Sequence, residues 1–205
     1  MSVSETVTAA PTMEKRRRRL LESALLVFSR RGFHETRIED VCAEAAISRA
    51  TFYRYFDSKD SLFDALVDLM SEEVIDIASH LAAVTPDEAG FATLSRWIGE
   101  LLANTERWGS VVNEIIRPRD EHAAARNRAI LLTTRFAEIL GERFKEGGVA
   151  DIDPQMAALA IIAMTERMAT QMTLWNVEID REVVIPSLAT MALKMLHPTI
   201  KFAGA

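Results

Sequence analysis

The 205-residue sequence has a single cysteine, Cys42, and no apolar run close to the roughly 18 residues that are needed to cross a bilayer. One cysteine cannot form a disulfide within the chain, so we expect Cys42 to be a small buried hydrophobe and not a redox sensor. The basic residues near the N-terminus follow a weakly apolar stretch, whereas in a signal peptide they precede it. We therefore expect a cytoplasmic protein with no membrane partner.

The sequence also lacks the short motifs that mark common enzyme classes. It contains no G-x-S-x-G elbow, no P-loop and no H-E-x-x-H motif, and no Cys or Ser is convincingly placed with a His base. The four histidines, His34, His80, His122 and His197, are widely separated and have no i, i+4 partners suited to a metal. We expect no enzyme activity, no catalytic residue, no cofactor and no metal site.

Strand-like alternation is missing as well, whereas helical periodicity extends along most of the chain. Hydrophobic residues make up 49% and charged residues 26%, which is ordinary for a globular protein and too apolar for a disordered one. Leu21, Ala24, Leu25 and Phe28 illustrate the pattern, since they lie at i, i+3, i+4 and i+7. The sequence predicts an all-α fold of about nine helices, over residues 13–31, 36–45, 48–56, 58–84, 87–104, 107–117, 119–146, 154–176 and 181–197.

Capping residues predict several helix boundaries. Thr36 with Glu39 forms a capping-box pair for the second helix, and Ser48 can cap the third. Thr85 begins another capping box, directly before a proline. Gly32 is placed to end the first helix.

Charge divides the chain unequally. The formal net charge is −6, but residues 12–62 contain 11 Lys and Arg and 8 Asp and Glu, a net charge of +3, which leaves −9 for the rest. A local basic segment is what a nucleic-acid partner requires. We expect a flexible tail over 1–12, a small helical domain over 13–60 and a larger helical domain over 61–205.

Residues 36–56 predict a helix-turn-helix, because two short helices follow a supporting helix and are separated by a turn of three or four residues. The last helix of such a unit can enter the major groove of DNA. Many enzymes contain helical corners too, so the geometry alone leaves both readings open, and the side chains favour DNA binding.

The segment RRLLESALLVFSRRGFHETRIEDVCAEAAISRATFYRYFDSKDSLFDAL resembles the DNA-binding domain of the TetR family over its whole length of about 50 residues. The similarity depends on the stretch Phe28 to Phe33 with Gly32, Thr36, Ile47-Ser48, Thr51-Phe52-Tyr53, Phe56, Ser58-Lys59-Asp60 and Leu62. Beyond Leu66 only the number and length of the helices are similar. Ala50, Phe52 and Tyr55 depart from the usual Gly, Leu and His, so no operator sequence can be transferred from a relative.

The resemblance implies a homodimeric transcription regulator with an N-terminal three-helix helix-turn-helix domain and a C-terminal ligand-binding and dimerisation domain. Its expected partners are double-stranded operator DNA and a small-molecule effector. The family pattern is a repressor that a small apolar or amphipathic ligand releases from a palindromic operator. A DNA-tethered adaptor, whose C-terminal domain binds a protein instead of a small ligand, is the alternative.

The recognition helix supplies the main DNA-binding candidates. Arg49 can bond a guanine in bidentate fashion, and the methyl group of Ala50 can touch a thymine methyl. The run Lys15 to Arg19 is either a solvated charge run or a backbone or minor-groove contact, and we favour contact. Similarity to the family adds contacts from the recognition helix and from the starts of the helices on either side. The expected DNA-binding residues are Arg16, Arg17, Thr36, Arg37, Ser48, Arg49, Ala50, Thr51, Tyr53, Arg54, Tyr55 and Lys59.

The C-terminal half concentrates methionines and tryptophans, which suit either an apolar pocket or ordinary core and dimer packing. We weight packing above ligand lining for any one of them. The candidate ligand-binding residues are Trp97, Trp108, Asn113, Met164, Glu166, Arg167, Met168, Met172 and Trp175. A small-residue face on helix 154–176 and the last helix are the candidate dimer interface. Its expected residues are Ala158, Thr165, Ala169, Thr173, Leu188, Met191, Ala192 and Met195.

Overall fold

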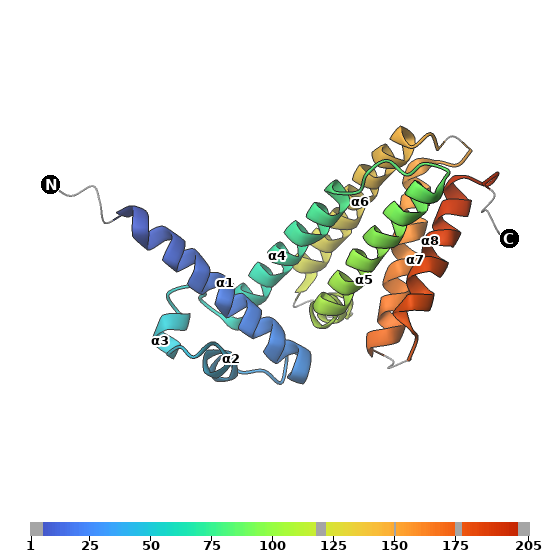
Figure 1. Ribbon diagram of the computed structural model, residues 1–205. Helices are drawn as coiled ribbons and strands as arrows, with labels where there is room; N and C mark the ends of the chain where they lie inside the picture. The colour runs from blue at the N-terminus through green and yellow to red at the C-terminus, as the bar shows by residue number, and fades with distance from the viewer. Residues whose placement is uncertain (1–5, 118–121, 150, 175–177, 201–205) are drawn as a thin grey trace. The chain divides into compact units, whose positions relative to one another are not determined.

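The computed structural model describes residues 6–117, 122–149, 151–174 and 178–200, and within them it contains eight α-helices and no strand. The all-α prediction is confirmed, with eight helices in the described residues where about nine were expected. The helices are α1 (Thr6–Arg31), α2 (Ile38–Ala45), α3 (Arg49–Phe52), α4 (Lys59–Ser79), α5 (Glu88–Ile116), α6 (Ala123–Glu146), α7 (Pro154–Leu174) and α8 (Arg181–Leu196), as labelled in Figure 1.

The chain folds as two compact units. The first unit contains the residues up to Leu69 together with residues 110–125, and the second contains residues 70–109 and the residues from 126 on. Helices α4 and α5 therefore contribute residues to both units. The first unit includes residues 13–60, the span expected for the small domain, together with the start of α4 and the end of α5, which is distant in the sequence.

The first unit is built on the apolar stripe of α1. Leu21, Ala24, Leu25 and Phe28 are all buried, as their spacing predicts. Gly32 then ends the helix with a φ of +78°, a left-handed conformation that glycine adopts at little cost. Cys42 is also buried, and burial followed by the charge of Glu39 raises the pKa of its thiol, as expected for a packing residue.

Aromatic rings pack against one another in the core of the first unit. The Phe28 and Phe33 ring centroids lie 5.4 Å apart, and those of Phe33 and Phe63 lie 5.0 Å apart, both in edge-to-face geometry. Phe63 comes from the first turns of α4 and is 1% exposed. The cluster fixes the loop after α1 against the start of α4.

The core of the second unit is formed by α5, α6, α7 and α8 with the end of α4. Its largest fully buried side chains include Leu94, Ile98, Phe136 and Phe144. Helices α7 and α8 pack side by side in Figure 1. No helix among the described residues is both long enough and apolar enough to span a bilayer.

The small-residue face of α7 packs inside this unit, which contradicts its assignment to a dimer interface. Ala158, Thr165 and Ala169 are at most 1% exposed, and Leu188 and Ala192 on α8 are also buried. Small side chains allow close approach of a helix from the same chain as well as from another chain. The side chain of Thr173 lies outside the described residues. Of the expected residues, Met191 is exposed and Met195 is half-buried, and the other large apolar residues exposed on these two helices are Met156 and Val183.

Several helix boundaries differ from the sequence prediction, among them the end of α4, which lies at Ser79 and not near residue 84. Helix α1 begins at Thr6, whereas a tail was expected up to residue 12. Helix α3 spans only four residues, so the helix predicted over 48–56 was too long. Helix α5 is continuous where a break was expected near residue 105. Thr105 is accommodated there because its hydroxyl donates to the carbonyl oxygen of Leu101 at 2.9 Å.

Two predicted caps are shifted along the chain. The N-cap of α2 is Arg37 and not Thr36, because the Thr36 hydroxyl is already bonded to the carbonyl oxygen of Gly32. The Arg37 N–H donates to Asp40 Oδ2 at 2.9 Å. Before α5, Asp87 caps the helix in place of Thr85. Its Oδ1 accepts a hydrogen bond from the Gly90 N–H at 2.9 Å. The hydroxyl of Thr85 donates to the same carboxylate.

Gly90 is a position where a side chain does not fit. A Cβ there would lie 1.8 Å from the carbonyl oxygen of Thr85, a backbone atom that cannot rotate out of the way as a side chain can.

We expect Gly90→Ala to lower the free energy of unfolding by about 1–3 kcal/mol, measured by urea denaturation of the full chain. Gly109, within α5, has nothing within 4 Å of its Cβ position. Gly109→Ala is the control and should stabilise by about 0.5–1 kcal/mol. Equal effects of the two substitutions would contradict this account.

Candidate nucleic-acid interface

A tight turn joins α2 to α3. Ala46 ends α2 with a φ of 53° in the left-handed region, where its N–H donates to the carbonyl oxygen of Ala43 and the Ile47 N–H donates to that of Cys42. Ser48 then caps α3, because its Oγ accepts a hydrogen bond from the Thr51 N–H at 3.1 Å. The helix-turn-helix predicted for residues 36–56 is therefore present, with the Ser48 cap as expected. After Phe52 the chain continues in tight turns, and the Phe56 N–H donates to the carbonyl oxygen of Phe52.

The segment from Ser48 to Phe56 has an inner and an outer side. Phe52 is fully buried and Phe56 is 5% exposed, so these two rings hold the segment on the core. Arg49, Ala50, Tyr53 and Arg54 are exposed, while Thr51 and Tyr55 are half-buried. This separation presents the N-terminal end of α3 to a partner.

Arg49 is held by two neighbours on this surface. Its Nη1 donates to Glu39 Oε1 at 2.5 Å, and its Nη2 donates to the Tyr53 hydroxyl at 3.3 Å. The guanidinium carbon also lies 5.8 Å from the centre of the Tyr53 ring. The hydrogen bond with Tyr53, and next the charge of Glu39, raise the pKa of the Arg49 guanidinium above its usual value.

The basic run in α1 contributes to the same unit. Arg16 is exposed, whereas Arg17 is half-buried, with its guanidinium 5.4 Å from the centre of the Phe56 ring. Arg18 forms an exposed ion pair with Glu22 at 3.5 Å. The structure thus brings Arg17 onto the recognition segment, and contact of Arg16 and Arg17 with DNA stays a prediction.

The residues that flank the helix-turn-helix have structural partners. Thr36 is 1% exposed and its hydroxyl points inward to Gly32, so any DNA contact there would come from its backbone or from the exposed Arg37. Lys59 Nζ donates to the carbonyl oxygens of Phe33 and Thr36 at 2.7 and 2.9 Å. The same ammonium lies 4.3 Å from the centre of the Phe33 ring. Lys59 fastens the loop before α2 to the start of α4.

A second polar cluster supports this loop, and sequence reasoning missed it. Glu114, from the end of α5, is 5% exposed, and its Oε1 lies 2.9 Å from His34 Nε2 and 3.8 Å from His122 Nε2. The buried His122 ring packs against Phe33 and Phe63, at centroid distances of 4.9 and 4.6 Å. A carboxylate buried beside two imidazoles ties the end of α5 to the loop that precedes the recognition unit.

Comparison with known proteins decides the family. The model described as "Bacterial regulatory proteins, tetR family" matches residues 20–66, which contain the helix-turn-helix. The chain is a member of the TetR family. It is therefore a helix-turn-helix transcriptional regulator, and the resemblance stated from the sequence is confirmed.

Relatives of this TetR-family regulator match most of its length. It is 27% identical over 175 residues to the HTH-type transcriptional regulator RutR of Escherichia coli, covering 82% of this chain and 80% of RutR. It is 27% identical over 152 residues to the HTH-type transcriptional regulator YfiR of Bacillus subtilis, covering 69% and 71%. Among solved structures, Salmonella enterica GusR aligns with a TM-score of 0.68 and 22% identity, covering 98% of this chain and 99% of GusR. The last match shows that the fold is shared.

The candidate ligand-binding residues of the TetR-family chain differ in burial, and four of them, Trp97, Met164, Met168 and Met172, belong to or pack against the core of the second unit. Trp97 and Trp108 are buried in the second unit, where their indole N–H groups donate to the Ile77 carbonyl oxygen and to Glu73. Asn113 belongs to the first unit. The three methionines are half-buried beside the core of the second unit, and Glu166 and Arg167 are exposed. Trp175 lies outside the described residues. Their role in ligand binding stays a prediction.

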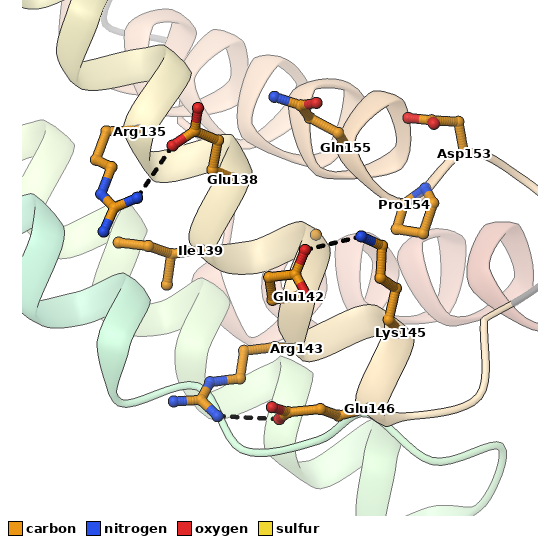
Figure 2. A pocket seen from close by; sticks show the side chains of 11 residues that line it. Arg135, Glu138, Ile139, Glu142, Arg143, Lys145, Glu146, Asp153, Pro154 and Gln155 are labelled. Atoms are coloured by element: carbon orange, nitrogen blue, oxygen red, sulfur yellow. Dashed lines mark hydrogen bonds and ion pairs between the residues drawn. The ribbon is translucent and has the colours of Figure 1, made fainter.

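A groove of about 540 Å³ lies between α6 and the start of α7, and it contains none of these candidates. Figure 2 shows that its walls are charged and that the charges pair with one another. Arg135 bonds Glu138 at 3.1 Å, and Lys145 bonds Glu142 at 2.7 Å. Such a wall is unsuited to an apolar ligand. A smaller groove of about 230 Å³ includes Trp97, with other residues of α5 and with residues 80–82, which directly follow α4.

Proposed function

We propose that this chain is a cytoplasmic, homodimeric repressor that binds a palindromic operator and leaves it when a small apolar or amphipathic ligand binds the C-terminal domain. The observation that carries the DNA-binding part is the Ser48-capped α3, which exposes Arg49 and Tyr53 above the buried Phe52. In a symmetric dimer two such helices would meet successive major grooves, about 34 Å apart. A ligand that binds two states of the dimer unequally would change that spacing and so the affinity for DNA.

The DNA-binding proposal is tested by selection from a random pool. The full-length chain is incubated with random duplex DNA at physiological salt, and bound DNA is enriched and sequenced over several rounds. We expect an inverted-repeat motif, because symmetric dimers select symmetric sites. Mobility shifts with the motif and with the region upstream of its own gene then measure affinity. Equal binding to random DNA would contradict the proposal.

The dimer is proposed to form through α7 and α8. Met156, Val183 and Met191 are about half exposed or more on these helices, and large apolar side chains in water favour association. Met191→Glu should convert the dimer to a monomer and remove most operator binding, as measured by analytical ultracentrifugation and mobility shift. Ala83→Glu, in an exposed segment between α4 and α5, is the control and should leave the dimer intact. A dimer that survives Met191→Glu would place the interface elsewhere.

One observation favours the second candidate function, a DNA-tethered adaptor. Ile130 and Leu131 are 60% and 69% exposed at adjacent positions of α6, which is not one of the two helices of the proposed dimer interface. Exposed apolar side chains at such a place suit a protein partner. If the adaptor function holds, Leu131→Glu should abolish capture of a protein by the DNA-bound dimer, and a screen of apolar small molecules should release no operator DNA. Release by one of them would favour the repressor.

A further inference from the structure

An acidic side chain lies on the basic recognition surface. Glu39, on α2, reaches across to α3 and bonds Arg49 at 2.5 Å, yet both side chains are more than half exposed. Residues 12–62 carry a net positive charge, so Glu39 opposes the local charge pattern. Its position beside the expected guanine-reading residue requires an explanation.

Neither stability nor overall affinity explains Glu39. An exposed ion pair contributes little to folding, because water screens both charges. A carboxylate close to DNA phosphates also weakens binding to every sequence alike. The helix dipole favours a carboxylate in the first turn of α2, but Asp40 supplies one there as well, so the specific effect of Glu39 is on Arg49.

Glu39 and Tyr53 together restrict the arginine. A guanidinium has five N–H donors, and the two bonds to Glu39 and Tyr53 use one each, so three are left for a base edge. Bidentate recognition of guanine needs two parallel donors in a fixed plane. An arginine that is already oriented loses less conformational freedom on binding than a free one.

We infer that Glu39 is a positioning residue for sequence discrimination, which orients Arg49 for a guanine and penalises DNA that does not offer one. On a matching site the oriented Arg49 gains its base contact and outweighs the repulsion between Glu39 and the phosphates. On other sequences the repulsion remains and the contact is lost. The inference rests on the proposed function and identifies how the same surface selects its DNA.

The test compares the motifs that wild type and Glu39→Gln select from random duplex DNA. We expect Glu39→Gln to bind random DNA more tightly, because one negative charge per chain is removed. At one base pair of each half-site its preference for G·C should fall by about 5-fold or more, the range of a single bidentate contact. Arg49→Ala should lose preference at the same base pair. The double variant should lose no more than Arg49→Ala alone, because Glu39 acts through Arg49.

Glu44→Gln is the matched control. Glu44 lies on the same helix and pairs with Arg30 at 3.0 Å, away from α3, so its replacement removes the same charge and a similar ion pair. It should leave the motif unchanged, and neither glutamine variant should shift the thermal unfolding midpoint strongly. An unchanged motif in Glu39→Gln, an equal loss in Glu44→Gln, or additive losses with Arg49→Ala would overturn the inference alone. A wild-type chain that enriches no motif would overturn the proposed function and the inference with it.

Discussion

Arg49→Ala should reduce the preference of the dimer for its operator over random DNA by about 30-fold or more in competition mobility shifts, because each of the two bidentate base contacts contributes about 1–3 kcal/mol. The effect is expected to be large because a palindromic site uses Arg49 twice. Arg49 is exposed on α3, so its removal should leave the thermal unfolding midpoint almost unchanged. Loss of affinity should therefore be much larger for the matched sequence than for random DNA, where only one positive charge per chain is missing.

Arg16→Ala provides the contrast for this prediction. Arg16 is exposed on α1, and a phosphate contact from it would weaken binding to operator and random DNA by similar factors. Its loss should also reduce the slope of log affinity against log salt concentration by about 1 per contact. If Arg49→Ala behaved in this way too, Arg49 would be a phosphate contact and not a reader of sequence.

Lys59→Met should lower the free energy of unfolding by about 3 kcal/mol or more, since hydrogen bonds to charged groups contribute about 1.5–3 kcal/mol each. Lys59 makes two such bonds, to the carbonyl oxygens of Phe33 and Thr36, and a methionine keeps the length of the side chain without the donors. Urea denaturation of the full chain measures the change. DNA affinity should fall only as far as the folded fraction falls.

The Lys59 experiment also separates two roles for this residue. Similarity to the family assigns it a contact with the DNA backbone, whereas the structure gives it two backbone partners within the protein. Lys15→Met, on the exposed part of α1, is the control for loss of a cation and should not affect stability. A Lys59→Met protein of normal stability with a reduced salt slope would assign the residue to DNA.

Local signals in the sequence predicted most of the first unit. The stripe of Leu21, Ala24, Leu25 and Phe28 predicted the buried face of α1, and Gly32 predicted its end. Ser48 predicted the cap of α3. These features depend on residues three or four positions apart, so a single sequence contains the information.

Contacts between distant segments could not be predicted in the same way. His34 and Glu114 are 80 positions apart, and nothing in the periodicity of α5 indicates that a carboxylate near its end is buried beside an imidazole. The sequence indicates Glu39 as half of a capping box but does not indicate Arg49 as its partner, because Arg49 lies on the next helix. The small face of α7 was assigned to another chain because composition does not tell which helix covers it.

Glu114 and His122 bear on how such regulators can be recombined. A fragment that ends after the first turns of α4 would retain Phe33 and Phe63 but lose the imidazole that packs on both rings and the acid beside His34. The rings of Phe33 and Phe63 would then be more exposed to water in the unit that contains the helix-turn-helix. A chimera that joins this unit to the ligand-binding domain of another regulator should therefore include residues 110–125 as a second, non-contiguous segment of the unit.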